Sequence, residues 1–208
     1  MRELRIAAIA ALTFTVLLGV AYPLVVTGAS QVVFPGRADG SFVRDGDRVV
    51  GSRLIGQDFS RDTGRTDADG NPVLEADPRY FQSRPSVTGY AADATFFNNQ
   101  GPNQQDLADQ LKGFVDAYLK REKPYTPGLT AARIPSDAVT TSASGVDPEI
   151  SVANARIQAN RIAPERGLPR AAVLRLVDEE AHRPLFGLAG DRSVNVLALN
   201  LALAKARG

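Results

Sequence analysis

The sequence predicts a mixed α/β (α+β) extracytoplasmic domain that is anchored in a membrane by one N-terminal transmembrane helix. Three observations predict this class. The run Ile6–Phe34 holds no charged side chain, Arg2 and Arg5 precede it, and the remaining chain alternates segments of helical and strand-like spacing. We therefore divide the chain into a transmembrane helix with its junction, residues 1–34, and a domain, residues 35–208.

The apolar run is long enough to span a bilayer. A transmembrane helix needs about 20 apolar residues to cross a hydrocarbon core of about 30 Å. The part from Ile6 to Val26 meets this need, and Thr27 to Pro35 is expected to lead into the domain. Positive flanks stay in the cytoplasm. Arg2 and Arg5 thus predict a single-pass protein of the cell (inner) membrane with a cytoplasmic N-terminus and an outer domain.

A cleaved signal peptide is the alternative interpretation of this segment. Its apolar core is about 7–15 residues long and ends at a small-x-small site. Gly19-Val20-Ala21 and Thr27-Gly28-Ala29 both fit such a site, but the apolar run continues past Ala21 to Val26, which favours an anchor. Small residues on the span, among them Ala11 and Gly19, favour close packing with another membrane helix.

Composition excludes several functions. Lys and Arg number 24 and Asp and Glu 23, so the chain lacks the excess base of a nucleic-acid-binding protein. It has no cysteine, which excludes disulfides, thiolate metal sites and cysteine nucleophiles. The single histidine, His182, leaves little room for zinc sites or histidine relays and is expected at a helix end or on the surface.

The pattern after the span predicts short strands, loops and three helices. Phe42-Val43 and Val49-Val50 flank Asp45-Gly46, a good hairpin turn. Other expected elements are a strand over 51–59, a surface loop over 60–76, helices over 104–120, 152–163 and 170–181, and an extended piece over 134–141. Ser151 is the expected N-cap of the second helix, and Pro164 and Gly167 are expected to end it. The alternating segment 193–203 fits a buried strand, with a closing helix as the alternative.

No motif assembles a catalytic site. Asp67–Asn71 resembles a calcium loop, but the ligand positions on either side are wrong, so we expect a turn. The segment Thr140–Ser151 is rich in hydroxyl residues and leads into a helix start. Such a loop can place N–H groups around an anion or a partner's backbone, or it can be an ordinary capped loop.

This loop and several blocks elsewhere resemble the C subunit of the Kdp-type potassium-transporting ATPase. The blocks keep their order over nearly the whole chain. They are Tyr22-Pro23-Leu24, Thr27-Gly28, Gln31, Phe34-Pro35, Gly40-Ser41, Gly51-Ser52, Leu54-Ile55-Gly56-Gln57, Phe59, Tyr80-Phe81, Arg84-Pro85-Ser86, Ser142–Ser151 with Ala155, Gln158 and Arg161, Val194–Leu197 and Leu199–Leu203. Two positions depart from the family pattern, Phe96-Phe97-Asn98 and Glu149.

The resemblance implies a non-catalytic accessory subunit. In that family a channel-like subunit selects potassium and a P-type subunit hydrolyses ATP, so ATP and K+ are handled by the complex. The C subunit supports assembly and is described as a catalytic chaperone that raises the pump's nucleotide affinity, a role tied to a glutamine that Gln158 matches. The implied interaction residues are Gln158, Arg161, Ser142, Ser144, Gly145 and Asp147, with Ala11, Gly19, Tyr22 and Pro23 for membrane packing. An outer domain conflicts with direct ATP contact. A membrane-anchored envelope enzyme and an anchored binding module for a small anion remain as alternatives.

Overall fold

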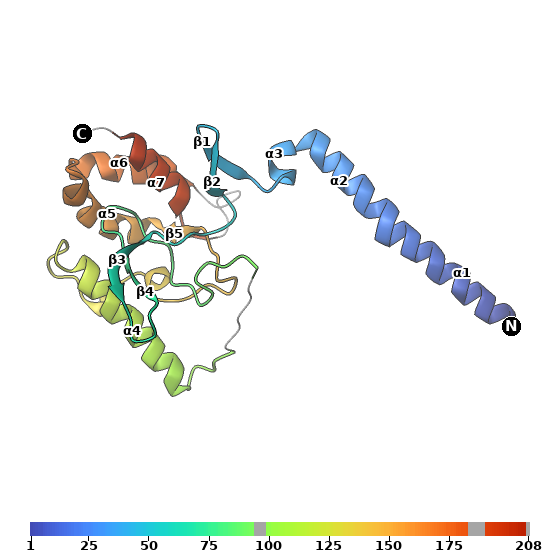
Figure 1. Ribbon diagram of the computed structural model, residues 1–208, viewed down its shortest axis with the longest axis horizontal. Helices are drawn as coiled ribbons and strands as arrows, with labels where there is room; N and C mark the ends of the chain where they lie inside the picture. Colours follow the sequence, from blue (N-terminus) through green and yellow to red (C-terminus); the bar gives the residue numbers. More distant parts are fainter. Residues whose placement is uncertain (94–98, 183–189, 207–208) are drawn as a thin grey trace. The chain divides into compact units, whose positions relative to one another are not determined.

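A computed structural model describes residues 1–93, 99–182 and 190–206. The family departure at Phe96-Phe97-Asn98 lies outside these residues. The chain forms two compact units, Met1–Ser52 and Arg53–Gly208 (Figure 1). Together they contain helices and strands preceded by one apolar helix, as the mixed α/β prediction requires.

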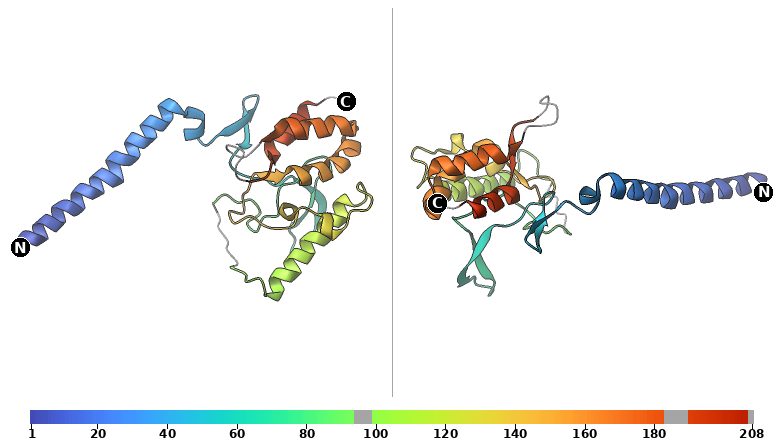
Figure 2. Two further views of the ribbon diagram at one scale, coloured as in Figure 1. Left: turned by 180° about the vertical axis from the view of Figure 1, so that it is seen from behind. Right: turned by 90° about the horizontal axis from the view of Figure 1, so that it is seen from above.

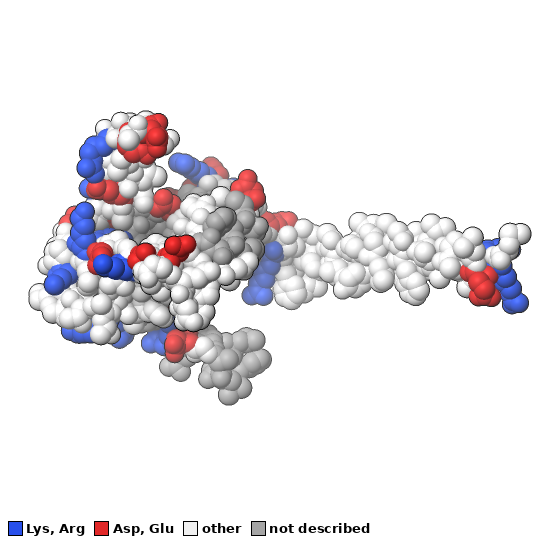
Figure 3. Space-filling model, turned by 90° about the horizontal axis from the view of Figure 1, so that it is seen from below, with Lys and Arg blue, Asp and Glu red and all other residues white. Residues whose placement is uncertain are grey.

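The first unit begins with one continuous helix, Arg2–Val33, of 32 residues. It comprises α1 (Arg2–Val16), a π-helical segment η1 (Leu17–Ala21) and α2 (Tyr22–Val33). It is long and apolar enough to span a membrane, and Figure 3 shows it uncharged beyond its first turn. The helix continues past Val26 to Val33, through most of the segment that is expected to lead into the domain. Nothing between Thr27 and Val33 stops a helix, and Pro35 is the first residue that does.

The π-helical segment lies next to the proline of the span. Pro23 has no N–H to donate, and the Tyr22 N–H bonds back to the Leu17 carbonyl, which is the wider π-helical spacing. Gly19 lies inside this segment, and a Cβ added there would meet no atom within 4 Å. Tyr22 and Pro23 open α2, whereas Ala11 lies one turn or more earlier, in α1.

The rest of the first unit is a short helix and a hairpin. Helix α3 spans Pro35–Ala38, and strands β1 (Phe42–Asp45) and β2 (Arg48–Ser52) pair antiparallel around Gly46. This confirms the predicted hairpin. The strand expected over 51–59 is wrong beyond Ser52, because the chain turns there and the Gly56 N–H bonds at 2.7 Å to the carbonyl of Val146 in a loop.

A second hairpin opens the domain, where the sequence predicted a surface loop. Strands β3 (Ser60–Thr66) and β4 (Pro72–Ala76) pair antiparallel, and Figure 2 shows this ribbon standing away from the helices of its unit. Polar contacts hold it, including Thr63 Oγ1 to the Val73 carbonyl at 2.7 Å. The segment Asp67–Asn71 is its turn, which confirms that interpretation over a calcium loop.

Helices and a small sheet form the rest of the domain. The helices are α4 (Gln105–Glu122), η2 (Ala131–Arg133), η3 (Ser136–Ala138), α5 (Val152–Arg166), α6 (Arg170–Glu180) and α7 (Val196–Lys205). The strands β5 (Glu149–Ser151), β6 (Ala181–His182) and β7 (Ser193–Asn195) form an antiparallel sheet in the order β5-β7-β6.

The three predicted helices are confirmed, with corrections nearby. Ser151 caps α5 by accepting the Asn154 N–H. Pro164 lies inside α5 and does not end it; Gly167, in the left-handed conformation at φ 64°, does. The extended piece expected over 134–141 is wrong, because η3 occupies its middle.

The C-terminal segment is mainly a helix. Only Ser193–Asn195 is a strand, and α7 follows, so the strand prediction was wrong over most of its length and the alternative was right. The buried residues of α7 are Val196, Leu197, Leu199, Asn200 and Leu203. Four of them lie at the i, i+3, i+4, i+7 spacing of one helix face, which packs into the main core with α5, α6 and Phe81.

Candidate functional site

Residues 80–86, which we call the central segment, form neither helix nor strand, and they are buried at Phe81 and Gln82 and half-buried elsewhere. Phe81 is fully buried and Gln82 is 6% exposed. Buried backbone N–H and C=O groups need hydrogen-bond partners. In the central segment those partners are side chains from two helices.

Two amide side chains clamp successive residues of this segment. Asn200 of α7 accepts the Phe81 N–H at 2.9 Å and donates to the Phe81 carbonyl at 3.0 Å. Gln158 of α5 accepts the Gln82 N–H at 2.8 Å and donates to the Gln82 carbonyl at 3.1 Å. Each amide thus exchanges two hydrogen bonds with one residue, as paired residues of a sheet do.

Gln158 has no unfilled hydrogen-bonding position. Its Nε2 also donates to Asn154 Oδ1 at 3.0 Å, and its Oε1 also accepts from Arg161 Nη2 at 3.2 Å. The residue is 1% exposed. A glutamine amide has two donors and one oxygen with two lone pairs, so all four positions are used.

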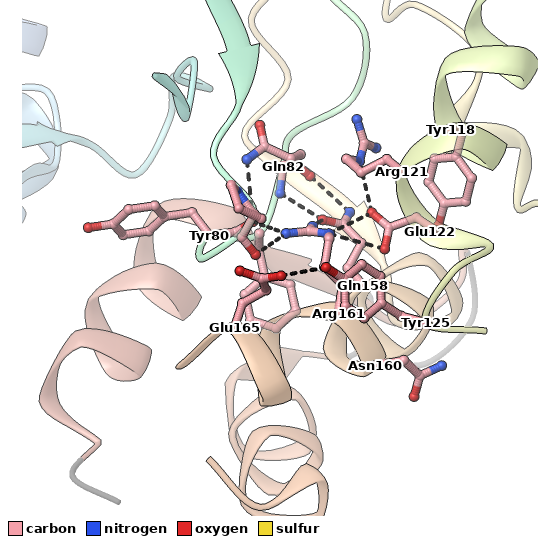
Figure 4. A network of polar contacts seen from close by, with 12 residues as sticks. Tyr80, Gln82, Tyr118, Arg121, Glu122, Tyr125, Gln158, Asn160, Arg161 and Glu165 are labelled. Carbon is pink, nitrogen blue, oxygen red and sulfur yellow. Dashed lines mark hydrogen bonds and ion pairs between the residues drawn. The ribbon is translucent and has the colours of Figure 1, made fainter. Parts of the chain in front are cut away.

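Arg161 continues the same network towards α4 (Figure 4). Its Nε lies 3.0 and 3.2 Å from the two carboxylate oxygens of Glu122, and its Nη1 donates to the carbonyls of Pro78 and Tyr80. Arg161 is 1% exposed and Glu122 is fully buried. Burial lowers the pKa of Arg161, whereas the Glu122 carboxylate raises it. A buried pair of this kind is compensated only when its remaining donors and acceptors are bonded, as they are here.

The residues Ser142, Ser144, Gly145 and Asp147 form a separate loop. Ser142 Oγ accepts the Gly145 N–H at 3.0 Å, and Ser144 Oγ accepts the Val146 N–H at 3.3 Å. Gly145 has φ 71°, and a Cβ there would approach Thr88 Oγ1 to 2.8 Å. The two serine hydroxyls therefore accept from the loop's own backbone.

This loop binds the far end of the central segment. Asp147 Oδ2 pairs with Arg84 Nη1 at 2.8 Å, and Ser86 Oγ donates to the Gly145 carbonyl at 2.6 Å. The sequence-predicted residues thus fall into two groups, the buried pair Gln158 and Arg161 and this partly exposed loop. Both groups bond to the central segment, and in the described part of the chain no direct hydrogen bond joins one group to the other.

Sequence reasoning missed the residues that complete the network. They are Gln82, Arg84, Glu122, Asn154 and Asn200. Asn200 carried a usable signal, because it is a polar residue within the apolar run 194–203. Glu122 gave no such signal in the sequence, since a charged residue near the end of a helix is common.

A possible hydrolase constellation does not have relay geometry. Ser193 Oγ lies 2.7 Å from Glu149 Oε2 and 3.3 Å from His182 Nε2, and the same Nε2 lies 2.8 Å from Glu149 Oε1. In a catalytic triad the hydroxyl and the carboxylate face different imidazole nitrogens. No group of three or more His, Cys, Asp or Glu suited to a metal occurs in the described part of the chain.

The fold and its network define the class, which is a small α/β domain preceded by one helix long enough to span a membrane. The family model described as "KdpC: K+-transporting ATPase, c chain" matches residues 4–205. The chain is 48% identical over 193 residues to the potassium-transporting ATPase KdpC subunit of Caulobacter vibrioides strain NA1000, covering 91% of this chain and 86% of that one. The KdpC subunit of Polaromonas naphthalenivorans is 46% identical over 204 residues, with 96% and 93% covered. That of Sorangium cellulosum is 44% identical over 208 residues, with 99% and 98% covered. This chain belongs to the KdpC family of potassium-transporting ATPase subunits.

Replacing Gln158 by alanine is expected to destabilise the domain strongly. The change leaves the buried N–H and carbonyl of Gln82 without their partner, and each such group costs about 1–3 kcal/mol. We expect urea denaturation of the detergent-solubilised full-length chain, followed by circular dichroism, to give a free energy of unfolding lower by about 2–4 kcal/mol. Gln105→Ala is the control, because Gln105 is exposed and its side chain bonds only Asp109 among the residues that the structure describes, and we expect a change within about 0.5 kcal/mol. Equal values for the two variants would contradict the clamp.

Proposed function

We propose that this chain is a non-catalytic accessory subunit of an ATP-driven, high-affinity potassium uptake complex, which it helps to assemble. The observation that carries the proposal is the family match over residues 4–205, which includes both the apolar helix and the domain. The polar groups that the sequence singled out serve the fold, and among the described residues we find no arrangement suited to hydrolysis. The chain's contribution is therefore structural, and the ATP chemistry is left to another subunit.

The proposed partners are a channel-like potassium-binding subunit and a P-type ATP-hydrolysing subunit, together with the lipid bilayer. The family resemblance implies both subunits. Lipid tails give helices no hydrophobic reason to associate, so small residues that allow close approach are the usual contact in a membrane. Ala11 and Gly19 are small and exposed along the Arg2–Val33 helix, and the π-helical segment around Gly19 changes the direction in which later side chains project.

The proposed orientation has the N-terminus in the cytoplasm and the domain outside. Arg2 and Arg5 lie within the first turns of the helix, where positive charges favour the cytoplasmic side. This positive-inside rule counts the Lys and Arg residues of short segments next to the span. It does not count the charges of a long domain such as the one that follows this span. This orientation separates the domain from cytoplasmic ATP.

We further propose that any effect of Gln158 on nucleotide affinity passes through the fold of the domain. All four hydrogen-bonding positions of Gln158 are filled by protein atoms. A nucleotide contact would have to break the clamp on Gln82. The catalytic-chaperone role then depends on how the folded subunit binds its partners.

An anion-binding module has less support. The hydroxyls of Ser142 and Ser144 already accept backbone N–H groups, and the N–H of Glu149 bonds to Asp147 Oδ1. A loop whose donors and acceptors are bonded within the protein offers little to an anion. We therefore prefer the complex subunit.

The orientation is tested by labelling, since the chain has no cysteine of its own. Asp69→Cys places one thiol at the exposed tip of the β3–β4 hairpin, and Glu3→Cys places one at the start of the span. In intact spheroplasts a membrane-impermeant maleimide is expected to label the first variant and to label the second only after permeabilisation. The reverse pattern would refute the orientation. Complete absence of the Glu3→Cys label from the mature chain would indicate a cleaved signal peptide.

Assembly is tested by adding bulk to the span. Ala11→Leu combined with Gly19→Leu is expected to abolish co-purification of the two large subunits, because larger side chains prevent close helix approach. Val20→Leu serves as the control, since it enlarges a side chain that is already bulky, and it should co-purify normally. If the double variant retains its partners, these positions do not form the contact. Recovery of the unaltered chain without any partner would overturn the proposed function itself.

The route by which Gln158 acts is tested by comparing two clamps. Gln158→Ala and Asn200→Ala each remove one amide that holds the central segment, at neighbouring residues. If Gln158 acts through the fold, both variants should raise the KM for ATP of the reconstituted complex to a similar extent, or leave it unchanged together. A rise confined to Gln158→Ala, with equal subunit content in both preparations, would instead support a nucleotide contact.

A further inference from the structure

A cavity of about 200 Å³ lies within the domain, next to the central segment. It is bounded by α4, by the base of the β3–β4 hairpin and by residues around 82–90. Phe114, Tyr118 and Pro85 supply apolar wall, and Asp58, Gln82 and Arg121 supply polar groups. None of the interaction residues implied by the family resemblance lines it.

Arg121 presents unused donors to this cavity. Its Nε bonds to Glu122 at 2.8 Å, and its guanidinium carbon lies 5.3 Å from the centre of the Tyr118 ring. Its two terminal nitrogens have no hydrogen-bond partner within residues 1–93, 99–182 and 190–206. Figure 4 shows them directed away from Glu122. The side chain is about one quarter exposed, so a ligand can reach it.

Arg121 and its neighbour Arg161 carry more positive charge than the one carboxylate between them can balance. The buried Glu122 carboxylate receives Arg161 as well as Arg121, so two guanidinium groups share one carboxylate. Asp58 is exposed at the cavity, accepts the Ser60 N–H, and forms no ion pair with Arg121. Arg121 shares its counter-ion with Arg161 and keeps free donors, so it can also bind an anion, above all the planar carboxylate that a guanidinium matches.

Gln82 adds an unused acceptor at the same cavity. Its Nε2 donates to the carbonyls of Phe59 and Asp77, both at 3.1 Å. Its Oε1 accepts no hydrogen bond from any residue that the structure describes, although the residue is only 6% exposed. Gln82 Oε1 is not among the buried side-chain atoms that lack a partner, so water in the cavity can reach it, and the N–H of a ligand can take the place of that water.

We propose that this cavity binds an α-carboxylate with an adjacent N–H group, the end group shared by a free amino acid and by the last residue of a polypeptide. The carboxylate accepts from the terminal nitrogens of Arg121, the N–H donates to Gln82 Oε1, and the carbon chain packs on Phe114 and Pro85. The volume equals that of roughly seven water molecules at about 30 Å³ each, which suits one end group. The site needs no other subunit in order to bind a small probe.

Four small probes separate the two contacts. N-acetylglycine carries the carboxylate and the N–H, N-acetylglycinamide lacks the carboxylate, N-acetylsarcosine lacks the N–H, and acetate lacks everything but the carboxylate. Calorimetric titration of the detergent-solubilised full-length chain is expected to show binding of N-acetylglycine, with each of the other three at least about tenfold weaker. Equal affinity for all four, or no binding of N-acetylglycine to the folded chain, would overturn the proposal.

Two variants place the binding in this cavity. Arg121→Gln is expected to weaken N-acetylglycine at least about tenfold, whereas Lys120→Gln, which removes a neighbouring charge from the same helix, should not. Ala117→Phe narrows the cavity and should also abolish binding, with Ala108→Phe on the same helix as its control. Circular dichroism checks that each variant is folded. Unchanged binding in both Arg121→Gln and Ala117→Phe would refute this location.

The assembled complex distinguishes the source of the end group. If a partner's chain end fills the cavity, N-acetylglycine should bind the isolated chain and not the purified complex. If the natural ligand is a free amino acid, the probe should bind both, and glycine should compete with it. Failure of the probe with the isolated chain refutes the cavity proposal alone, because co-purification of the subunits is measured separately.

Discussion

The structure depends on the pairing of two side-chain amides with the backbone of Phe81 and Gln82. A buried segment outside helices and strands must still satisfy its N–H and carbonyl groups. Asn200 and Gln158 meet this requirement, and in doing so they fix α7 and α5 to the same two residues. The two amides bond to backbone N–H and C=O groups, so these bonds depend on where the segment's backbone lies and not on which side chains the segment carries. The two helices therefore specify where the segment lies, while Phe81 fills the core between them.

The amide pairing extends into a chain of contacts that reaches α4. Tyr118 of α4 donates to Asn154 at 2.9 Å, and Asn154 accepts from Gln158. Glu122, one turn further, holds Arg161. Burial raises the pKa of Tyr118, so its hydroxyl keeps its proton and remains a donor. A buried polar network that is only partly hydrogen-bonded would make the domain less stable than an apolar core would. This network is almost fully hydrogen-bonded, so it favours one arrangement of the core. Arg84 Nε is the exception, because it is buried and has no hydrogen-bond partner among the described residues.

Sequence patterns predicted the elements whose signal is local and missed those held by distant partners. The α4 and α6 helices follow from apolar spacing, and the Ser151 cap predicts the start of α5. The β3–β4 hairpin was missed because its strands are polar and are held by side-chain contacts such as Thr63 with Val73. The C-terminal segment carries leucines at both period 2 and helical spacing, so the pattern could not decide. Gln158 and Arg161 were singled out by resemblance alone. Their partners Gln82 and Glu122 lie 76 and 39 positions away, which no local pattern reveals.

The hydrogen bonds of Gln158 to the central segment suggest how this buried residue can influence ATP use by another subunit. A residue that holds the central segment also holds the Ser142–Asp147 loop indirectly, because that loop binds Arg84 and Ser86 of the same segment. Losing the clamp would therefore change a partly exposed surface as well as the core. A surface that binds another subunit transmits such a change without any nucleotide reaching Gln158. Because the proposed orientation keeps the domain away from cytoplasmic ATP, this indirect route is the one that both the contacts of Gln158 and the placement of Arg2 and Arg5 favour.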